Sequence, residues 1–198
     1  MTTTGPAPRI SRRPFVADLI AAVPGALVVT GLGSPSYDVF AAGDRDENFY
    51  LWGAMGSAVP VGLGLAVAQP QRPVLVVTGD GEMLMGIGSL ATVGVQQPAN
   101  LSIVVLDNGH YGETGMQRSH SSMGADLTGI ARASGIAESY LITDGAQVEQ
   151  VAARAAARSG PSFAQVLIDA DEPPRALPAR DGTHLKNRFR AALGLEPF

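Results

Sequence analysis

The sequence predicts an α/β fold, a three-layer sandwich in which a six-stranded, mainly parallel sheet lies between two layers of helices. Strand-like and helix-like segments alternate along the chain with Gly or Asp at the joints, the pattern of a parallel sheet covered on both faces. Several strand-like segments are unbroken apolar runs, such as VLVVTGD and LSIVVLDN, which is typical of strands buried on both faces. A length of 198 residues fits one ordinary domain with a substantial core.

The expected elements follow an N-terminal arm, residues 1–13, which is rich in Gly, Pro and Arg and is predicted to be flexible. The apolar runs place strands at Ala26–Thr30, Asn48–Leu51, Pro73–Thr78, Leu101–Asp107, Ser139–Ile142 and Ser162–Ile168. The segments between them place helices at Pro14–Val23, Ser36–Ala42, Met55–Ala68, Glu82–Val95, Asp126–Ala133, Gln147–Arg158 and His184–Leu193. The proline-rich stretch Glu172–Pro178 predicts an extended crossover before the last, basic helix. Residues 14–198 are therefore expected to form a single domain.

The composition excludes several classes of protein. Hydrophobic residues make up 45% of the chain and charged residues 16%, which excludes a disordered chain and leaves apolar surface for a partner. The net charge is −4 without a run rich in Lys or Arg, which excludes binding to nucleic acid or an anionic membrane. The absence of cysteine removes disulfides, thiolate metal sites and cysteine nucleophiles. No segment has the pattern of a membrane span or a secretory signal, so a cytoplasmic protein is expected.

The segments that follow the strands are the candidates for a site, because ligands of open α/β sheets bind beyond the carboxyl ends of the strands. After the first strand, Gly31 and Gly33 are similar to a dinucleotide-binding G-x-G-x-x-G pattern, but Ser36 stands where the third glycine belongs. A nicotinamide or flavin site is thus less favoured than an ordinary glycine turn. After the second strand, LWGAMGSAVPVGLGLAVA indicates by itself only a helix packed closely against the sheet.

Two further strands end in a carboxylate or an amide. Asp80 lies between Gly79 and Gly81, which permit a tight turn and aim the next helix N-terminus at a ligand. Asn108 follows the next strand, and Mg²⁺ prefers such hard oxygen ligands together with phosphate oxygens. Alternatively, Asp80 caps its helix and Asn108 makes a turn. The helix and strand between the two junctions make them neighbours in the sheet, which favours the metal and diphosphate interpretation.

The segment from Gly79 to Asn108 resembles the cofactor motif of thiamine diphosphate enzymes, which begins G-D-G and ends in Asn after a helix and a strand. LWGAMGSA resembles the segment that lines the cofactor pyrimidine in decarboxylases and acetolactate synthases of this superfamily. Between Val28 and Gln117 the patterns FY…G.MG, GDG…GSL.T and DN..YG.TG.Q are most similar to those of sulfopyruvate and phosphonopyruvate decarboxylases, in the beta subunit. The resemblance implies the thiamine diphosphate-binding fold and, within it, the diphosphate-binding domain.

The resemblance also implies roles for particular residues. Asp80 and Asn108 would ligate Mg²⁺ through side-chain oxygens, and His110 would do so through its main-chain carbonyl. Met55 would hold thiamine diphosphate in its bent shape, although filling a core is the commoner role of methionine. The other cofactor-binding residues, which would contact the cofactor mainly through main-chain atoms, are Gly53, Ala54, Gly79, Gly81, Glu82, Tyr111 and Gly112.

The resemblance further implies an enzyme that needs a second chain, a subunit of a 2-oxo acid decarboxylase. In this superfamily a glutamate on the pyrimidine-binding domain activates the cofactor, whereas this chain shows the diphosphate motif and has room for one such domain. The glutamate is therefore expected from a separate pyrimidine-domain subunit, most simply in a heterotetramer. The alternatives are a carboligase or lyase with the same cofactor, or a non-catalytic binding module, which has no need of Asp80 and Asn108.

Three residues on the glycine-rich loop after Asn108 are candidate catalytic groups. His110 and His120 flank the loop and are candidate proton donors. Glu113 could meet an acidic substrate there. Each of the three is equally ordinary on an exposed loop, and the sequence does not determine which 2-oxo acid is the substrate.

Overall fold

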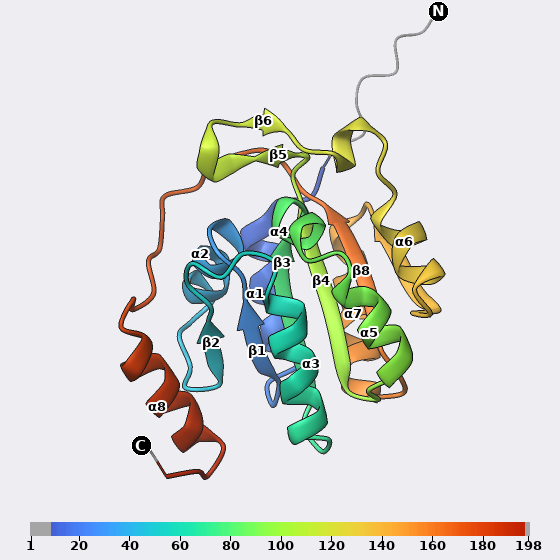
Figure 1. Ribbon diagram of the computed structural model, residues 1–198. Coiled ribbons are helices and arrows are strands. Elements are labelled where there is room, and N and C mark those ends of the chain that lie inside the picture. The colour runs from blue at the N-terminus through green and yellow to red at the C-terminus, as the bar shows by residue number, and fades with distance from the viewer. Residues whose placement is uncertain (1–8, 197–198) are drawn as a thin grey trace, which may run out of the picture.

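The central sheet determines the architecture of the chain, which a computed structural model describes for residues 9–196. Its strand order is β2-β1-β3-β4-β8-β7, and every neighbouring pair is parallel (Figure 1). The strands are β1 (Leu27–Thr30), β2 (Asn48–Tyr50), β3 (Val74–Gly79), β4 (Leu101–Asp107), β7 (Glu138–Ile142) and β8 (Ser162–Leu167). The predicted α/β class with a six-stranded parallel sheet is confirmed.

A separate hydrophobic core covers each face of the sheet. One core contains α1 (Arg12–Ala22), α2 (Ser34–Ala41) and α7 (Val148–Ala157). The other contains α3 (Ala58–Ala68), α5 (Ser89–Gln96) and α6 (Leu127–Ala133). In β3, Leu75 and Val77 point into the first core and Val74 and Val76 into the second, because successive strand residues face opposite sides. This explains why the central strands are apolar without alternation.

The last helix, α8 (Gly182–Ala192), covers the β2 edge of the sheet. Its Leu185 belongs to the first core and its Phe189 to the second. The helix begins two residues before the predicted start, because the Asp181 side chain accepts hydrogen bonds from the N–H groups of Thr183 (2.9 Å) and His184 (3.1 Å). Covering an edge strand in this way prevents pairing with other chains at that edge.

The structure corrects the predicted helix Glu82–Val95, which is two helices, α4 (Asp80–Met85) and α5. The break lies at Gly86–Gly88, where Gly86 packs so closely on Gly56 that an added Cβ would lie 2.1 Å from the Gly56 carbonyl oxygen. The predicted helix Met55–Ala68 likewise begins only at Ala58, because Gly56 has a φ of +84°, which a right-handed helix does not permit. Both differences arise from one close contact between main chains.

The N-terminal prediction needs a further correction. Residues 1–8 of the expected arm lie outside the described residues, but Ile10 forms a parallel bridge with Ile168, and α1 begins at Arg12. Residues 10–13 therefore belong to the fold. No helix within residues 9–196 is both long and apolar enough to cross a membrane.

Two irregular segments lie over the carboxyl ends of the strands. After β4 the chain forms a short hairpin, β5 (His110–Tyr111) and β6 (Gln117–Arg118), with 3-10 turns at Gly112–Thr114 and Ser121–Met123. After β8 an extended segment crosses to α8 on the far edge (Figure 1). The third 3-10 turn, Gly145–Gln147, precedes α7.

Candidate functional site

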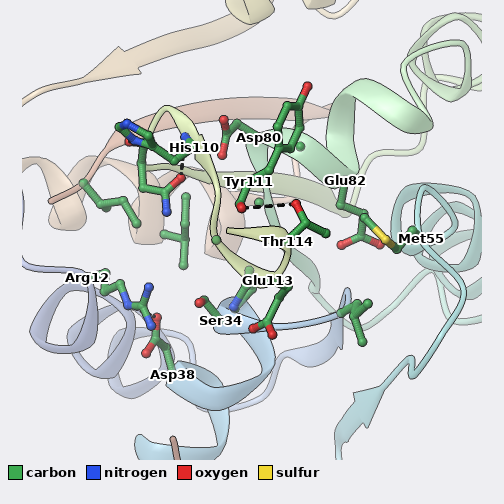
Figure 2. Close-up of a pocket in the computed structure, with 18 residues that line it drawn as sticks. Arg12, Ser34, Asp38, Met55, Asp80, Glu82, His110, Tyr111, Glu113 and Thr114 are labelled. Atoms are coloured by element: carbon green, nitrogen blue, oxygen red, sulfur yellow. Dashed lines mark hydrogen bonds and ion pairs between the residues drawn. The ribbon is translucent and has the colours of Figure 1, made fainter. Parts of the chain in front are cut away.

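A cavity of about 360 Å³ lies where β1 and β3 send the chain to opposite faces of the sheet. After β1 the chain enters α2 on one face, and after β3 it enters α4, whose Met83 belongs to the core on the other face. Such a divergence opens a crevice at the carboxyl ends of parallel strands. The cavity (Figure 2) is lined by all the predicted cofactor-binding residues except Gly53 and Ala54, namely Met55, Gly79, Asp80, Gly81, Glu82, Asn108, His110, Tyr111 and Gly112.

Asp80 is the first residue of α4 and is 2% exposed. Its side chain does not cap the helix. Instead, Oδ2 accepts hydrogen bonds from the hydroxyls of Ser119 and Ser121, the second at 3.0 Å, which leaves Oδ1 for another ligand. Ser121 also lies 2.8 Å from Oδ1 of Asp107. Burial and the nearby charge of Asp107 raise the pKa of Asp80 to about 6.

Asn108 is oriented by the turn that follows β4. Its Oδ1 accepts a hydrogen bond from the His110 N–H at 2.9 Å, so the alternative role of Asn108 as a turn residue is realised. A carbonyl oxygen has a second lone pair, so this bond leaves Oδ1 able to ligate a metal. The imidazole Nδ1 of His110 lies 2.8 Å from the Asn108 carbonyl oxygen, which ties the ring to the main chain.

The loop after β4 folds over the first turn of α4. The ring of Tyr111 packs on Gly81 so closely that a Cβ there would lie 2.8 Å from a ring carbon. The Tyr111 hydroxyl lies 2.5 Å from Nδ1 of His120. His120 itself does not line the cavity, whereas Glu113 does and forms an ion pair with Arg175 at 3.2 Å. Of the three predicted catalytic residues, the structure therefore brings His110 and Glu113 to the cavity.

Met55 lies at the open side of the cavity, and its side chain is 44% exposed. Gly53, with a φ of +70°, and Ala54 lie outside the lining. Met85, at the end of α4, is 64% exposed. The Met55 end of the site is thus open and apolar.

Two features of the cavity were missed by sequence reasoning. The carboxyl group of Glu82 is buried and accepts a hydrogen bond from Thr78 Oγ1 at 2.7 Å. Arg12, which is 3% exposed, forms an ion pair with the buried Asp38 at 3.0 Å. No local pattern marks the Arg12–Asp38 pair, because its two residues lie on different helices. For the Glu82 contact the available sequence signals were Gly31, which leaves room for a neighbouring side chain, and Thr78, a hydroxyl donor at the end of β3.

The turn after β1 also explains the failed dinucleotide pattern. Ser36 is buried, and its hydroxyl donates to the main-chain oxygen of Gly31 and lies 2.6 Å from Thr30 Oγ1. The residue at the third glycine position therefore closes the turn from inside. This arrangement serves the local fold and leaves no reason to expect the dinucleotide contact at that position.

The electrostatic balance of the cavity favours a metal cation. Four carboxylates line it, those of Asp38, Asp80, Glu82 and Glu113, whereas Arg12 is the one Lys or Arg among the described lining residues. Within residues 9–196 no group of three or more His, Cys, Asp or Glu side chains is arranged to hold a metal. A metal at Asp80 would therefore take the amide oxygen of Asn108 and a main-chain oxygen as further ligands, the donor set that suits Mg²⁺.

Comparisons with known proteins agree with this geometry. The family described as "Thiamine pyrophosphate enzyme, C-terminal TPP binding domain" matches residues 39–166. A phosphonopyruvate decarboxylase of Streptomyces viridochromogenes is 41% identical over 197 residues, covering 96% of this chain and 48% of the relative. A "sulfopyruvate decarboxylase subunit beta" of Methanothermobacter thermautotrophicus is 40% identical over 142 residues, covering 72% of this chain and 73% of the relative.

Solved structures show the same fold. The thiamine diphosphate-dependent 4-hydroxybenzoylformate decarboxylase of Rhodococcus jostii RHA1 superposes with a TM-score of 0.69 at 19% sequence identity, covering 87% of this chain and 36% of that one. A putative thiamin diphosphate-dependent enzyme from Mycobacterium smegmatis gives a TM-score of 0.67 at 22% identity, covering 86% and 36%. The chain thus spans about half the length of the phosphonopyruvate decarboxylase and about a third of these two structures.

Proposed function

Because the chain belongs to the thiamine pyrophosphate enzyme family, through its C-terminal TPP binding domain, we propose that its cavity binds thiamine diphosphate and Mg²⁺. The observation that carries the proposal is the meeting of Asp80, Asn108 and Met55 around one cavity, although they follow three different strands. We further propose that the protein is a subunit of a heteromeric 2-oxo acid decarboxylase that acts on sulfopyruvate or phosphonopyruvate. The names and similarity of the relatives support this substrate class.

The proposed binding mode uses the two ends of the cavity differently. Asp80 Oδ1, Asn108 Oδ1 and the main-chain carbonyl of His110 would hold the metal, whose positive charge would offset that of the carboxylates around it. The N–H groups of Gly81 and Glu82, at the start of α4, face the diphosphate. Met55 supports the bent form of the cofactor at the open end. When bound, thiamine diphosphate supplies the electron sink for the carbanion that forms as carbon dioxide leaves a 2-oxo acid.

The chain's own residues have three tasks in this reaction. The metal ligands and the α4 N-terminus bind and orient the cofactor. The loop that carries Tyr111 covers the first turn of α4 and excludes water from the diphosphate. His110 and Glu113 line the cavity and are the proposed groups that hold or move a proton near the substrate. His120 is proposed to act through Tyr111, to which it is hydrogen-bonded.

A partner chain with a pyrimidine-binding domain is proposed to complete the site. Its support is the exposed apolar side chains on α3, α4 and α5, where Val67, Met85 and Val95 are 62%, 64% and 81% exposed. Helix α3, with the sequence AVPVGLGLAVA, carries no charged residue. Exposed apolar surface of this kind marks sites of association. A partner on this side would cover Met55 and supply the activating glutamate, and a heterotetramer is the simplest closed assembly.

The experiment compares the chain alone with the chain mixed with a pyrimidine-domain partner. Carbon dioxide release is measured from sulfopyruvate, phosphonopyruvate and pyruvate in the presence of thiamine diphosphate and Mg²⁺. We expect no release from the isolated chain and release from one of the two acidic substrates after mixing. Robust release by the isolated chain would refute the two-chain arrangement. Product in which a new carbon–carbon bond has formed, without net aldehyde release, would instead identify a carboligase.

A further inference from the structure

The carboxyl group of Glu82 lies where three segments of the site meet. The residue is 4% exposed, and the Thr78 hydroxyl at the end of β3 donates to its Oε2 at 2.7 Å. The end of β1 contacts the same oxygen: a Cβ added to Gly31 would lie 1.3 Å from Oε2, a distance that no side chain could occupy. Gly31 is therefore a glycine because a buried carboxylate takes the place of its side chain.

Main-chain N–H groups at the start of α3 and after β1 surround the carboxylate. Those of Gly56 and Ala58, before and at the start of α3, and that of Leu32 lower the pKa of Glu82, although the larger effect of burial raises it. None of them completes a hydrogen bond of normal geometry with Oε1, which has no partner of that kind within residues 9–196. Within residues 9–196 the carboxylate is thus held by the Thr78 hydroxyl and by the partial charges of N–H donors, and not by a basic side chain.

These contacts bear on Met55, the residue next to Gly56. The Gly56 main chain touches α4 a second time at Gly86, where an added Cβ would lie 2.1 Å from the Gly56 oxygen. The Met55 side chain is 44% exposed and so has few contacts of its own. Its place in the cavity therefore depends on the segment that follows it, and that segment is held against α4 at Glu82 and at Gly86.

We infer that Glu82 is a positioning residue, whose buried side chain joins the ends of β1 and β3 to the start of α3 and thereby holds Met55 at the cavity. This goes beyond the main-chain contact with the diphosphate that the proposed function assigns to Glu82. The part that concerns the cofactor rests on the proposed function, whereas the structural part does not.

The inference predicts that glutamine cannot replace Glu82. An amide has the same shape as a carboxylate, but one of its two terminal atoms is an N–H₂ donor. The groups that face the carboxylate are all donors, namely the Thr78 hydroxyl and the main-chain N–H groups of Leu32, Gly56 and Ala58. In Glu82→Gln the new side-chain N–H₂ group would therefore face one of these donors. If Glu82 were only a space-filling residue, the isosteric change would be mild.

The first experiment follows hydrogen exchange of the isolated chain by mass spectrometry, without cofactor. In Glu82→Gln we expect exchange of the amides in residues 53–58 to rise about tenfold or more, since a buried donor left without an acceptor destabilises the segments around it. Exchange in α7 should stay unchanged. The matched control is Glu149→Gln, which alters an exposed glutamate on α7 and should change neither segment.

A second variant keeps the test decisive if Glu82→Gln does not fold. Thr78→Val removes one donor and keeps the carboxylate, so we expect a smaller rise in amide exchange, confined to residues 31–32 and 53–58. Thr78→Ser keeps the hydroxyl and should exchange like the parent protein. Unchanged exchange in residues 53–58 in the folded variants would overturn the inference. A uniform rise across all elements would also overturn it, because it would show a general loss of stability.

The cofactor readout uses the chain assembled with its partner. Because Met55 and not the metal site is displaced, Glu82→Gln should lower kcat at least about tenfold while the Kd of thiamine diphosphate with Mg²⁺ changes less than about threefold. The double variant Glu82→Gln/Met55→Ala should be no slower than Met55→Ala alone. Additive losses would contradict positioning through Met55. If no variant, nor the parent, binds thiamine diphosphate, the proposed function fails while the exchange result still decides the role of Glu82.

Discussion

The carboxylates of Asp80 and Glu82 at the cavity and the carboxylate of Asp44 beside α8 have opposite electrostatic surroundings. Asp44 accepts two hydrogen bonds from Arg188, at 2.6 and 2.9 Å, and one from Tyr50 at 2.9 Å. Although burial raises the pKa of Asp44, these donors and the Arg188 charge lower it overall. At the cavity, burial and Asp107 raise the pKa of Asp80 to about 6, and burial raises that of Glu82.

This difference in pKa distinguishes a carboxylate that stabilises the fold from carboxylates that are available to a ligand. Asp44 and Arg188 neutralise each other within the chain, and the pair fastens α8 to the β2 edge. Among the described residues Asp80 has hydroxyl donors but no basic partner, so its charge is left for a ligand to balance. Groups with such perturbed pKa values in a cleft are typical of functional sites. Stability and binding should therefore respond in opposite ways when the two regions are altered.

The largest expected effect is the loss of cofactor binding in Asp80→Ala. Removing this proposed metal ligand would leave the diphosphate charge without its cation, so affinity for thiamine diphosphate with Mg²⁺ should fall about a hundredfold or more, beyond the loss typical of outer-shell changes. Isothermal titration calorimetry of the assembled protein measures this. The Tm of the chain should stay level or rise, because one of two neighbouring buried carboxylates is gone. Unchanged affinity would remove the metal site from Asp80.

Omitting Mg²⁺ tests the same region without a mutation. Asp38 and Glu113 are paired with arginines, but Asp80 and Glu82 have no such partner within residues 9–196 and should repel an uncompensated diphosphate. Binding to the parent protein should therefore become undetectable when EDTA replaces Mg²⁺ and should return when Mg²⁺ is added. Equal affinity in both conditions would show that Arg12 and the main-chain N–H groups suffice.

A smaller effect is expected at Met55, which is proposed to set the shape of the bound cofactor and not its attachment. Met55→Ala should lower kcat about a hundredfold, as a displacement of about 1 Å in an active site does, with little change in the Kd of thiamine diphosphate. Met55→Leu, which keeps the volume, should remain within a few-fold of the parent. Steady-state kinetics with the partner present provides the measurement. A parent-like rate in Met55→Ala would place the pyrimidine elsewhere.

At α8 the effect should fall on stability alone. Arg188→Ala removes a two-point hydrogen bond to Asp44 and should lower the free energy of unfolding by roughly 1–2 kcal/mol, with cofactor affinity unchanged. Arg154→Ala is the control, because the Arg154–Glu138 ion pair is long, at 3.8 Å, and the hydrogen bonds from Arg154 to Ser159 lie at the surface, so their loss should cost less. Denaturant titration separates the two variants. Equal losses in both would show that the geometry of the Asp44 pair is not what stabilises the edge.

The smallest effect is the pH dependence of that stabilisation. The folded pKa of Asp44 lies below its unfolded value, so its contribution is present above the unfolded pKa and is lost as the pH falls. The difference in stability between the parent and Arg188→Ala should be constant from pH 5 to 7 and should shrink below about pH 4. A difference that grows on acidification would reverse the assignment.

Much of this arrangement was predictable because its signals are local. Strand-like apolar segments, several of them unbroken runs, identified all six strands of the sheet, and Asp80 and Asn108 stood out because each follows such a run directly. The rule that strand ends meet at one edge then placed both at one cavity. The helix break at Gly86 was not predictable, because a Gly-x-Gly inside a helical pattern has no distinct meaning until Gly56 is known to lie against it.

The sequence by itself therefore determined the fold class, the family and the acidic and amide groups at the ends of β3 and β4, since each depends on neighbours along the chain. Only the tertiary structure decided which of these groups remain uncompensated. Glu82 faces Gly31, Arg12 faces Asp38, and Asp44 faces Arg188, pairs that are distant in sequence. Whether a carboxylate meets a cation, a hydroxyl or a bare main chain depends on how the crossovers bring distant segments together, and this contact sets its pKa and its role.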